Sequence, residues 1–133
     1  TPHESSAASD VYKRQDQMSI KEIGSALRKT SRLCRDLKID KKEFFGGSMT
    51  ISSLGGIGGT FFTPIINPPE VAILGVGKSF DRLVKVKDKF ISRKILPISL
   101  SYDHRIIDGA EGARFCVYLG KCLGKDFAFK LAV

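Results

Sequence analysis

The fold of this chain is decided by residues 96–109, which read Leu96-Pro97-Ile98-Ser99-Leu100-Ser101-Tyr102-Asp103-His104-Arg105-Ile106-Ile107-Asp108-Gly109. Every second residue from Leu96 to Tyr102 is apolar or aromatic, which is the period of a strand with one buried face. A strand is therefore predicted over residues 96–102, and His104 is expected just beyond its end.

A helix is predicted to follow this loop. Asp108 precedes Glu111 by three positions, a spacing that resembles a helix capping box. The residues expected to form the buried stripe of this helix are Ala113, Cys116, Val117 and Leu123.

Further strands are predicted upstream. Residues 71–76 are apolar or glycine throughout, which predicts a strand covered on both faces near the centre of a sheet. Residues 48–53 alternate polar and apolar, so Ser48, Thr50 and Ser52 are expected to share a face that points toward solvent.

A hairpin is predicted from residues 83–86 and 90–91, which flank Lys87-Asp88-Lys89. The surrounding block, residues 78–94, holds seven basic and two acidic residues. Lysines on an exposed hairpin commonly protect its edge from aggregation. That role is preferred here, with anion binding as the alternative.

A helix is also predicted near the beginning of the chain, because Ser19 and Glu22 form a capping-box pattern. Its apolar face would consist of Ile20, Ile23, Leu27, Cys34 and Leu37, with Thr30 filling the gap. Asp40 and Glu43 repeat the capping pattern before Phe44 and Phe45. Residues 1–15 show no such period and are expected to be a disordered or non-native lead. The prediction is an α+β domain with central strands and a helix at each end.

Composition sets limits on function. The chain has 133 residues, of which 42% are hydrophobic and 27% charged, as expected for one soluble domain. Its apolar runs are shorter than the ~20 residues that a membrane helix needs. Three cysteines without zinc-ligand spacing indicate neither a disulfide framework nor a metal site, and a reducing compartment fits best.

The net charge of +8 suits an anionic partner such as nucleic acid, a membrane surface or a phosphate-bearing cofactor. A basic nucleic-acid module is one hypothesis, but the sequence has no recognised nucleic-acid motif. The glycine-rich residues 55–59 lack both phosphate-loop patterns. They are interpreted as a place where backbones pack closely.

His104 is the candidate general base, because His3 lies in the lead. A strand end holds a side chain rigidly at the margin of a cleft. On position alone, a hydrogen-bonded structural histidine explains His104 at least as well.

The motif around His104 favours chemistry. His-x-x-x-Asp-Gly, preceded by Ser-Tyr-Asp, resembles the chloramphenicol-acetyltransferase-like acyltransferases, in the form found in dihydrolipoamide acyltransferases. Residues 45–55 and 63–76 resemble the same family, and the resemblance extends over residues 20–131. Residues 69–76 and 108–115 look most like the acetyl-transferring member of pyruvate dehydrogenase complexes, with the succinyl and branched-chain members as alternatives.

The resemblance implies acyl transfer between a lipoyl arm and coenzyme A, on a mixed-sheet sandwich with flanking helices. His104 would be the base, since a thiol with a pKa of about 8.5 is mostly protonated at neutral pH. Ser52 would stabilise the oxyanion, with Ser53 as the fallback on the other face of the strand. Asp108 would orient the loop besides capping the helix, and Arg105 would brace the loop.

The resemblance also implies a setting. In this family the serine reaches the histidine of a neighbouring subunit, so a homotrimer that builds a larger core is expected. The lipoyl group would be carried on another domain, and the decarboxylase and dihydrolipoamide dehydrogenase components would be partners, without nucleic acid, membrane or metal. Residues 16–133 would be the C-terminal half of the catalytic domain, with little activity alone. The bacterial cytoplasm is the expected location, the mitochondrial matrix the alternative, and a non-catalytic assembly core remains a second hypothesis.

Overall fold

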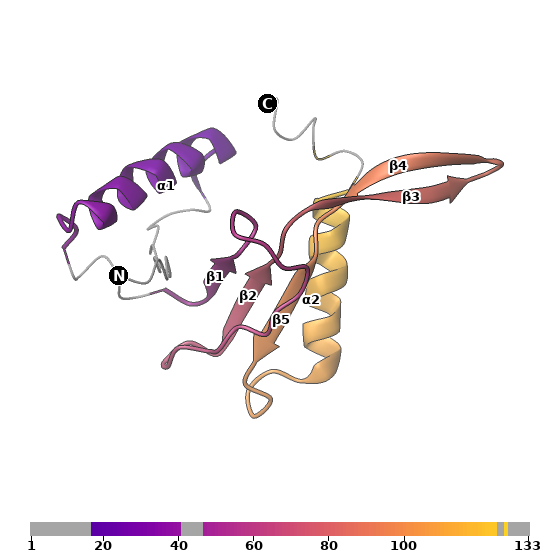
Figure 1. Cartoon of the computed structure of the whole chain (residues 1–133). Helices are drawn as coiled ribbons and strands as arrows, with labels where there is room; N and C mark the ends of the chain where they lie inside the picture. Colours follow the sequence, from indigo (N-terminus) through magenta and orange to yellow (C-terminus); the bar gives the residue numbers. More distant parts are fainter. Residues whose placement is uncertain (1–16, 41–46, 125–126, 128–133) are drawn as a thin grey trace. The chain divides into compact units, whose positions relative to one another are not determined.

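The computed structural model describes residues 17–40, 47–124 and 127. The elements follow the order α1 (Ile20–Arg35), β1 (Thr50–Ser53), β2 (Ala72–Val76), β3 (Phe80–Val86), β4 (Lys89–Ile95), β5 (Ile98–Tyr102) and α2 (Gly109–Cys122) (Figure 1). This order confirms the predicted α+β class. The predicted lead, residues 1–15, lies outside the described residues. The second predicted capping pattern also lies outside them, except for its first residue, Asp40. Residues 49–112 form one compact unit, and the residues on either side form a second.

Strand β2 is the central strand of a three-stranded sheet with the order β1-β2-β5. It pairs in parallel with β1 and antiparallel with β5. Its residues Ala72, Ile73 and Leu74 are 7%, 4% and 6% exposed and make up the apolar core of the described chain. The prediction of a strand that is buried on both faces is confirmed.

One face of this sheet carries an unexpected set of polar residues. Thr50 lies opposite Ile73 and Ser52 opposite Gly75. Both side chains therefore lie on the same face of the sheet as Ile73 and Gly75. Thr50 is only 3% exposed, whereas Ile51 is 61% exposed. The prediction that Thr50 and Ser52 face solvent is therefore wrong.

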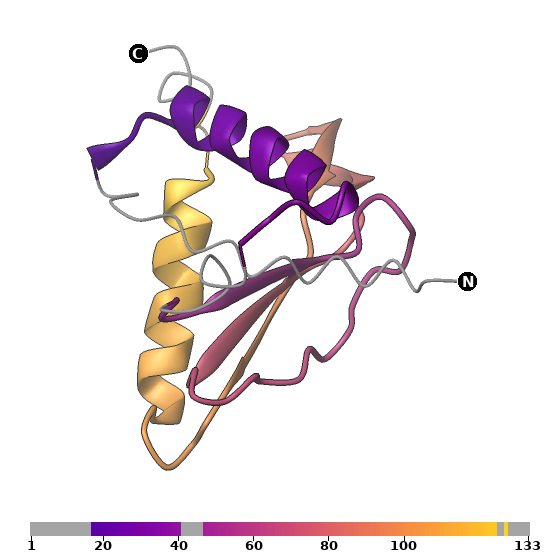
Figure 2. The same cartoon turned by 90° about the vertical axis from the view of Figure 1, so that its left-hand side faces the viewer.

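The segment of residues 54–70 explains this reversal. It passes along one side of the sheet (Figure 2), and a Cβ atom on Gly75 would lie 3.0 Å from the ring of Phe62. Glu70, at the end of the segment, accepts a 2.6 Å hydrogen bond from the hydroxyl of Thr50. Within residues 49–112, this loop therefore covers the polar face of the sheet through Phe62 and Glu70.

Strands β3 and β4 form the predicted hairpin as a separate two-stranded sheet. Val86 pairs with Lys89 across a two-residue turn, in which Lys87 has a φ of 56°. Leu83 and Phe90 are each 70% exposed. The hairpin prediction is confirmed, with strands longer than the sequence pattern indicated.

Helix α1 begins where the sequence predicts. The Ser19 hydroxyl accepts a hydrogen bond from the amide of Glu22, and the Glu22 carboxylate accepts one from the amide of Ser19. The helix contains no buried residue. Leu37 was predicted on its apolar face but lies beyond the helix end, with a φ of 54° and 92% exposure; the last turn has ended before the period reaches it.

Helix α2 begins as predicted, but its predicted stripe is not buried. Gly112 is its only buried residue, whereas Ala113 is exposed, Val117 is 59% exposed, and Leu123 lies past the helix end. Gly112 is buried because the ring of Tyr102 lies against it, where a Cβ atom would be 2.8 Å away. Within the described ranges no helix is long and apolar enough to cross a membrane.

Replacing Gly77 by alanine is expected to destabilise the fold. Its Cβ atom would lie 2.2 Å from the carbonyl oxygen of Thr60, a backbone atom that cannot rotate away. Such overpacking costs about 1–3 kcal/mol, measured as a lower midpoint of urea unfolding. Gly56→Ala is the matched control, because nothing lies within 4 Å of its Cβ position. Equal losses in the two variants would contradict this account of Gly77.

Candidate active site

His104 lies in the turn between β5 and α2. Strand β5 ends at Tyr102, and the amides of Ile106 and Ile107 both bond to the carbonyl oxygen of Asp103, at 3.0 and 2.9 Å. The amide of Asp103 bonds to the carbonyl oxygen of Val71 at 2.8 Å. The loop is therefore fixed by its own turn and by the segment that precedes β2. His104 lies just beyond the end of a strand, as predicted.

The His104 side chain is exposed and lies beside Tyr102. The centroids of the two rings are 5.8 Å apart, with a 40° angle between their planes. A Cβ atom on Gly109 would lie 3.8 Å from both His104 Nε2 and the Tyr102 hydroxyl. The sequence analysis did not connect Tyr102 with His104. Gly109 and Gly112, in the first turn of α2, could have indicated this proximity, because they leave space for the two rings.

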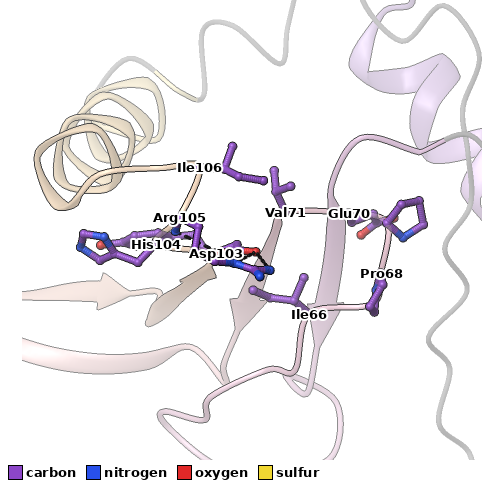
Figure 3. Close-up of a pocket in the computed structure, with 10 residues that line it drawn as sticks. Ile66, Pro68, Glu70, Val71, Asp103, His104, Arg105 and Ile106 are labelled. Atoms are coloured by element: carbon purple, nitrogen blue, oxygen red, sulfur yellow. Dashed lines mark hydrogen bonds and ion pairs between the residues drawn. The ribbon is translucent and has the colours of Figure 1, made fainter.

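Arg105 points away from His104. Its guanidinium pairs with Asp103, with Nε 2.9 Å from Oδ1 and Nη2 2.5 Å from Oδ2. In Figure 3 this pair lies toward Ile66 and Val71, whereas the imidazole of His104 lies on the opposite side of the loop. The prediction that Arg105 braces the loop is confirmed.

The same pair sets the charge of Asp103. The Arg105 side-chain hydrogen bonds, followed by the Arg105 backbone amide, lower the pKa of Asp103 to about 2. They also raise the pKa of Arg105. Asp103 therefore stays ionised over the whole range in which a histidine titrates.

Arg105→Ala is expected to return the pKa of Asp103 toward about 3.9, the value of an unpaired aspartate. A carboxylate with a lowered pKa stabilises the fold above about pH 4, and the contribution is lost as the pH falls through about 2. An NMR titration of the Asp103 carboxyl carbon measures the shift. Lys94→Ala, which breaks the exposed pair with Asp81, should leave it unchanged. An unaltered Asp103 pKa in Arg105→Ala would contradict the assigned cause.

A cavity of about 570 Å³ adjoins this loop. Its walls come from the loop and from the segment before β2, and they include Ile66, Glu70, Val71, Asp103 and Arg105 (Figure 3). His104 also belongs to its lining, although its imidazole is turned away from Ile66 and Val71. The backbone that carries His104 thus separates the imidazole from this cavity.

Asp108 is the N-cap of α2. Its Oδ1 atom accepts a 2.7 Å hydrogen bond from the amide of Glu111, which satisfies one of the free amides of the first turn. The predicted cap is thereby confirmed. The proposed orienting role of Asp108 toward the loop stays a prediction.

Ser52 is half-buried in β1, on the face that Thr50 also occupies. Tyr102 pairs with Ala72, on the other face of β2 from Gly75, the partner of Ser52. Gly75 and Ala72 are three residues apart along β2, a distance of about 10 Å. Strands β1 and β5 lie on either side of β2, so they are two strand spacings apart, about 10 Å across the sheet. Ser52 and Tyr102 therefore lie on opposite faces of the sheet, and their Cα atoms are roughly 14 Å apart by the same spacings. The ring of His104 lies on the side of Tyr102, beside its ring.

Residues 9–128 match the family model of the 2-oxoacid dehydrogenases acyltransferase catalytic domain, and the chain belongs to this family. It is similar to the dihydrolipoyllysine-residue acetyltransferase components of the pyruvate dehydrogenase complexes of Cupriavidus necator, with 50% identity over 88% of this chain and 21% of that protein, and of Haemophilus influenzae, with 51% over 85% and 20%.

Two solved structures share the fold at a TM-score of 0.79 each and cover 85% of this chain. One is the dihydrolipoamide acetyltransferase of Azotobacter vinelandii, 47% identical, and the other is the cubic core of a pyruvate dehydrogenase multienzyme complex, 46% identical. This chain covers 46% of each of those chains and about a fifth of the length of the two curated relatives.

The Azotobacter structure belongs to an investigation of one serine, one histidine and one asparagine in the catalytic mechanism of that enzyme. Its histidine follows the serine by 52 positions, and its asparagine follows the histidine by four. In this chain His104 follows Ser52 by the same 52 positions, and Asp108 follows His104 by four.

Proposed function

We propose that the parent protein transfers an acetyl group between a lipoyl arm and coenzyme A in a pyruvate dehydrogenase complex. The observation that carries the proposal is the serine-to-histidine spacing that this chain shares with the Azotobacter acetyltransferase. The names of the relatives support acetyl as the acyl group over its succinyl and branched-chain alternatives.

His104 acts as the general base. It takes the proton from the thiol of coenzyme A, and the thiolate attacks the thioester carbonyl of the acetyl-lipoyl substrate. His104 then returns the proton to the departing dihydrolipoyl sulfur. A thiol with a pKa of about 8.5 is mostly protonated at neutral pH, so attack by its sulfur is faster when a base removes the proton. The exposure of His104 at a rigid strand end supports this role.

Ser52 donates a hydrogen bond to the oxyanion of the tetrahedral intermediate. A placed donor of this kind contributes about 3–4 kcal/mol to the transition state. Because Ser52 and His104 lie on opposite faces within one chain, the working pair is completed by a second copy. A homotrimer supplies that copy, and the opposite-face arrangement of the sheet supports it.

Asp108 positions the loop from its C-terminal side. It caps α2 directly after the loop, while the Asp103–Arg105 pair braces the N-terminal side. An aspartate stands here at the spacing at which the Azotobacter enzyme has its asparagine. Both side chains carry an oxygen that accepts a hydrogen bond, so either residue type can cap a helix.

The wider setting of the proposal follows from the relatives. The trimers build a larger core, which the cubic core of a similar chain supports. Coenzyme A and a lipoyl group on another domain are the substrates, and the decarboxylase and dihydrolipoamide dehydrogenase components are the partners. The bacterial sources of the relatives support the cytoplasm as the location. Residues 16–133 correspond to the C-terminal half of the catalytic domain, and alone they have little activity.

The test is transfer from acetyl-CoA to dihydrolipoamide by the full-length parent protein. Turnover with the acetyl donor, at a higher kcat/KM than with succinyl or branched-chain donors, is the expected result. Absence of transfer with all three donor classes would overturn the proposal and leave an assembly core as the leading account.

A further inference from the structure

A hydrogen bond between distant residues connects the strand of Ser52 with the cavity beside His104. The Thr50 hydroxyl donates to Glu70 Oε2 at 2.6 Å, across 20 positions of sequence. Thr50 is 3% exposed and Glu70 is half-buried. A short bond to a carboxylate is stronger than one between neutral groups, and this one lies largely out of water.

Both ends of this bond are close in sequence to the proposed catalytic residues. Thr50 precedes Ser52 by two positions on the same face of β1. Glu70 precedes Val71, whose carbonyl oxygen accepts the amide of Asp103 at 2.8 Å, and His104 is the next residue. The side chain of Glu70 also lines the cavity (Figure 3).

We propose that Glu70 is a positioning residue that couples β1 to the His104 loop through Thr50 on one side and the Val71–Asp103 hydrogen bond on the other. The turn that carries Glu70 is closed by a 3.0 Å bond from its amide to the carbonyl oxygen of Asn67. The Glu70 carboxylate holds this turn against β1. The turn then positions the carbonyl oxygen of Val71, which accepts the amide of Asp103. Its catalytic consequence rests on the proposed function, whereas the coupling itself does not.

The experiment compares Glu70→Ala, Glu70→Gln and Thr50→Val in the full-length parent protein. Hydrogen exchange of a peptide that contains Asp103 is measured beside acetyl transfer. Glu70→Ala and Thr50→Val are expected to speed this exchange about tenfold or more, because each removes the charged hydrogen bond. They should also lower kcat about 10- to 100-fold, the effect of displacing a reacting group by about 1 Å.

Rescue distinguishes positioning from a general loss of folding. The amide oxygen of glutamine can accept the Thr50 hydroxyl, so Glu70→Gln should stay within about fivefold of the parent in both readouts. The double variant Thr50→Val/Glu70→Ala should lose no more than either single variant, because both act on one bond. Asp88→Asn, in the exposed hairpin turn, is the control for removal of a carboxylate.

Two outcomes would overturn the inference: unchanged exchange in Thr50→Val, or a loss in Glu70→Gln as large as in Glu70→Ala. If exchange responds as expected while the parent shows no transfer with any acyl donor, the coupling stands and the proposed function fails. If the parent transfers acetyl while exchange near Asp103 is unaffected, the proposed function stands and the coupling fails.

Discussion

His104→Ala is expected to lower kcat for acetyl transfer in the parent protein by about 10²–10⁴-fold, the contribution of a positioned general base. The exposed imidazole lies at the end of β5, so its removal leaves no buried cavity and should leave the fold intact. The turn remains closed by the Asp103 carbonyl and by the Asp103–Arg105 pair. The loss should therefore appear in turnover rather than in folding.

The measurement is the steady-state rate over a range of pH. The rate of His104→Ala should stay far below that of the unmodified protein throughout this range. Tyr102→Phe is the matched control, because it alters the neighbouring ring without removing a base. A His104→Ala variant that keeps the parental rate would eliminate His104 as the base.

Ser52→Ala is expected to lower kcat by about 10²–10³-fold, as loss of one oxyanion donor does in other acyl-transfer enzymes. The change removes only a hydroxyl from a half-buried position. Affinity for coenzyme A should change little, since the donor acts on charge that develops in the transition state. The expected signature is a fall in kcat with a nearly constant KM.

The control for this variant is Ser53→Ala, because Ser53 lies on the other face of β1 and pairs with Val76. A parental rate in Ser53→Ala together with a low rate in Ser52→Ala would support the assignment. The reverse pattern would transfer the donor role to Ser53 and would contradict the proposed geometry.

The sequence predicts the parts of the fold that depend on local patterns. The unbroken apolar run of β2, the capping box at Ser19 and the lysine-flanked turn at Lys87 each follow from side-chain period or backbone chemistry. Alternation also identifies correctly that Thr50 and Ser52 share a face. It cannot tell which face will be covered, because the cover is provided by Phe62 and its loop.

The predicted stripe on α2 was wrong for a related reason. A helical period shows which side chains share a face, but burial requires a surface that covers them. The chain spans 46% of the chains in the similar solved structures, so period alone could not show whether such a surface is present. Leu37 likewise continues the period of α1 after the hydrogen bonding has ended.

The candidate site was accessible to sequence reasoning only in part. His104 stands out by its position after a strand, and Asp108 by its spacing from Glu111. Ser52 has no local feature that separates it from Ser53 and was assigned through the family resemblance. The bond between Thr50 and Glu70 could not be anticipated, because residues 20 positions apart meet only once the sheet and the turn have formed.

The placement of Ser52 and the Tyr102–His104 pair on opposite faces of the sheet has a genetic consequence under the proposed function. Each polypeptide then contributes one half to two separate reaction centres. Chains that lack only the serine, mixed with chains that lack only the histidine, would regenerate some whole centres by complementation. A copy that lacks only one of the two residues would disable one centre that it shares with a neighbour and leave the other intact.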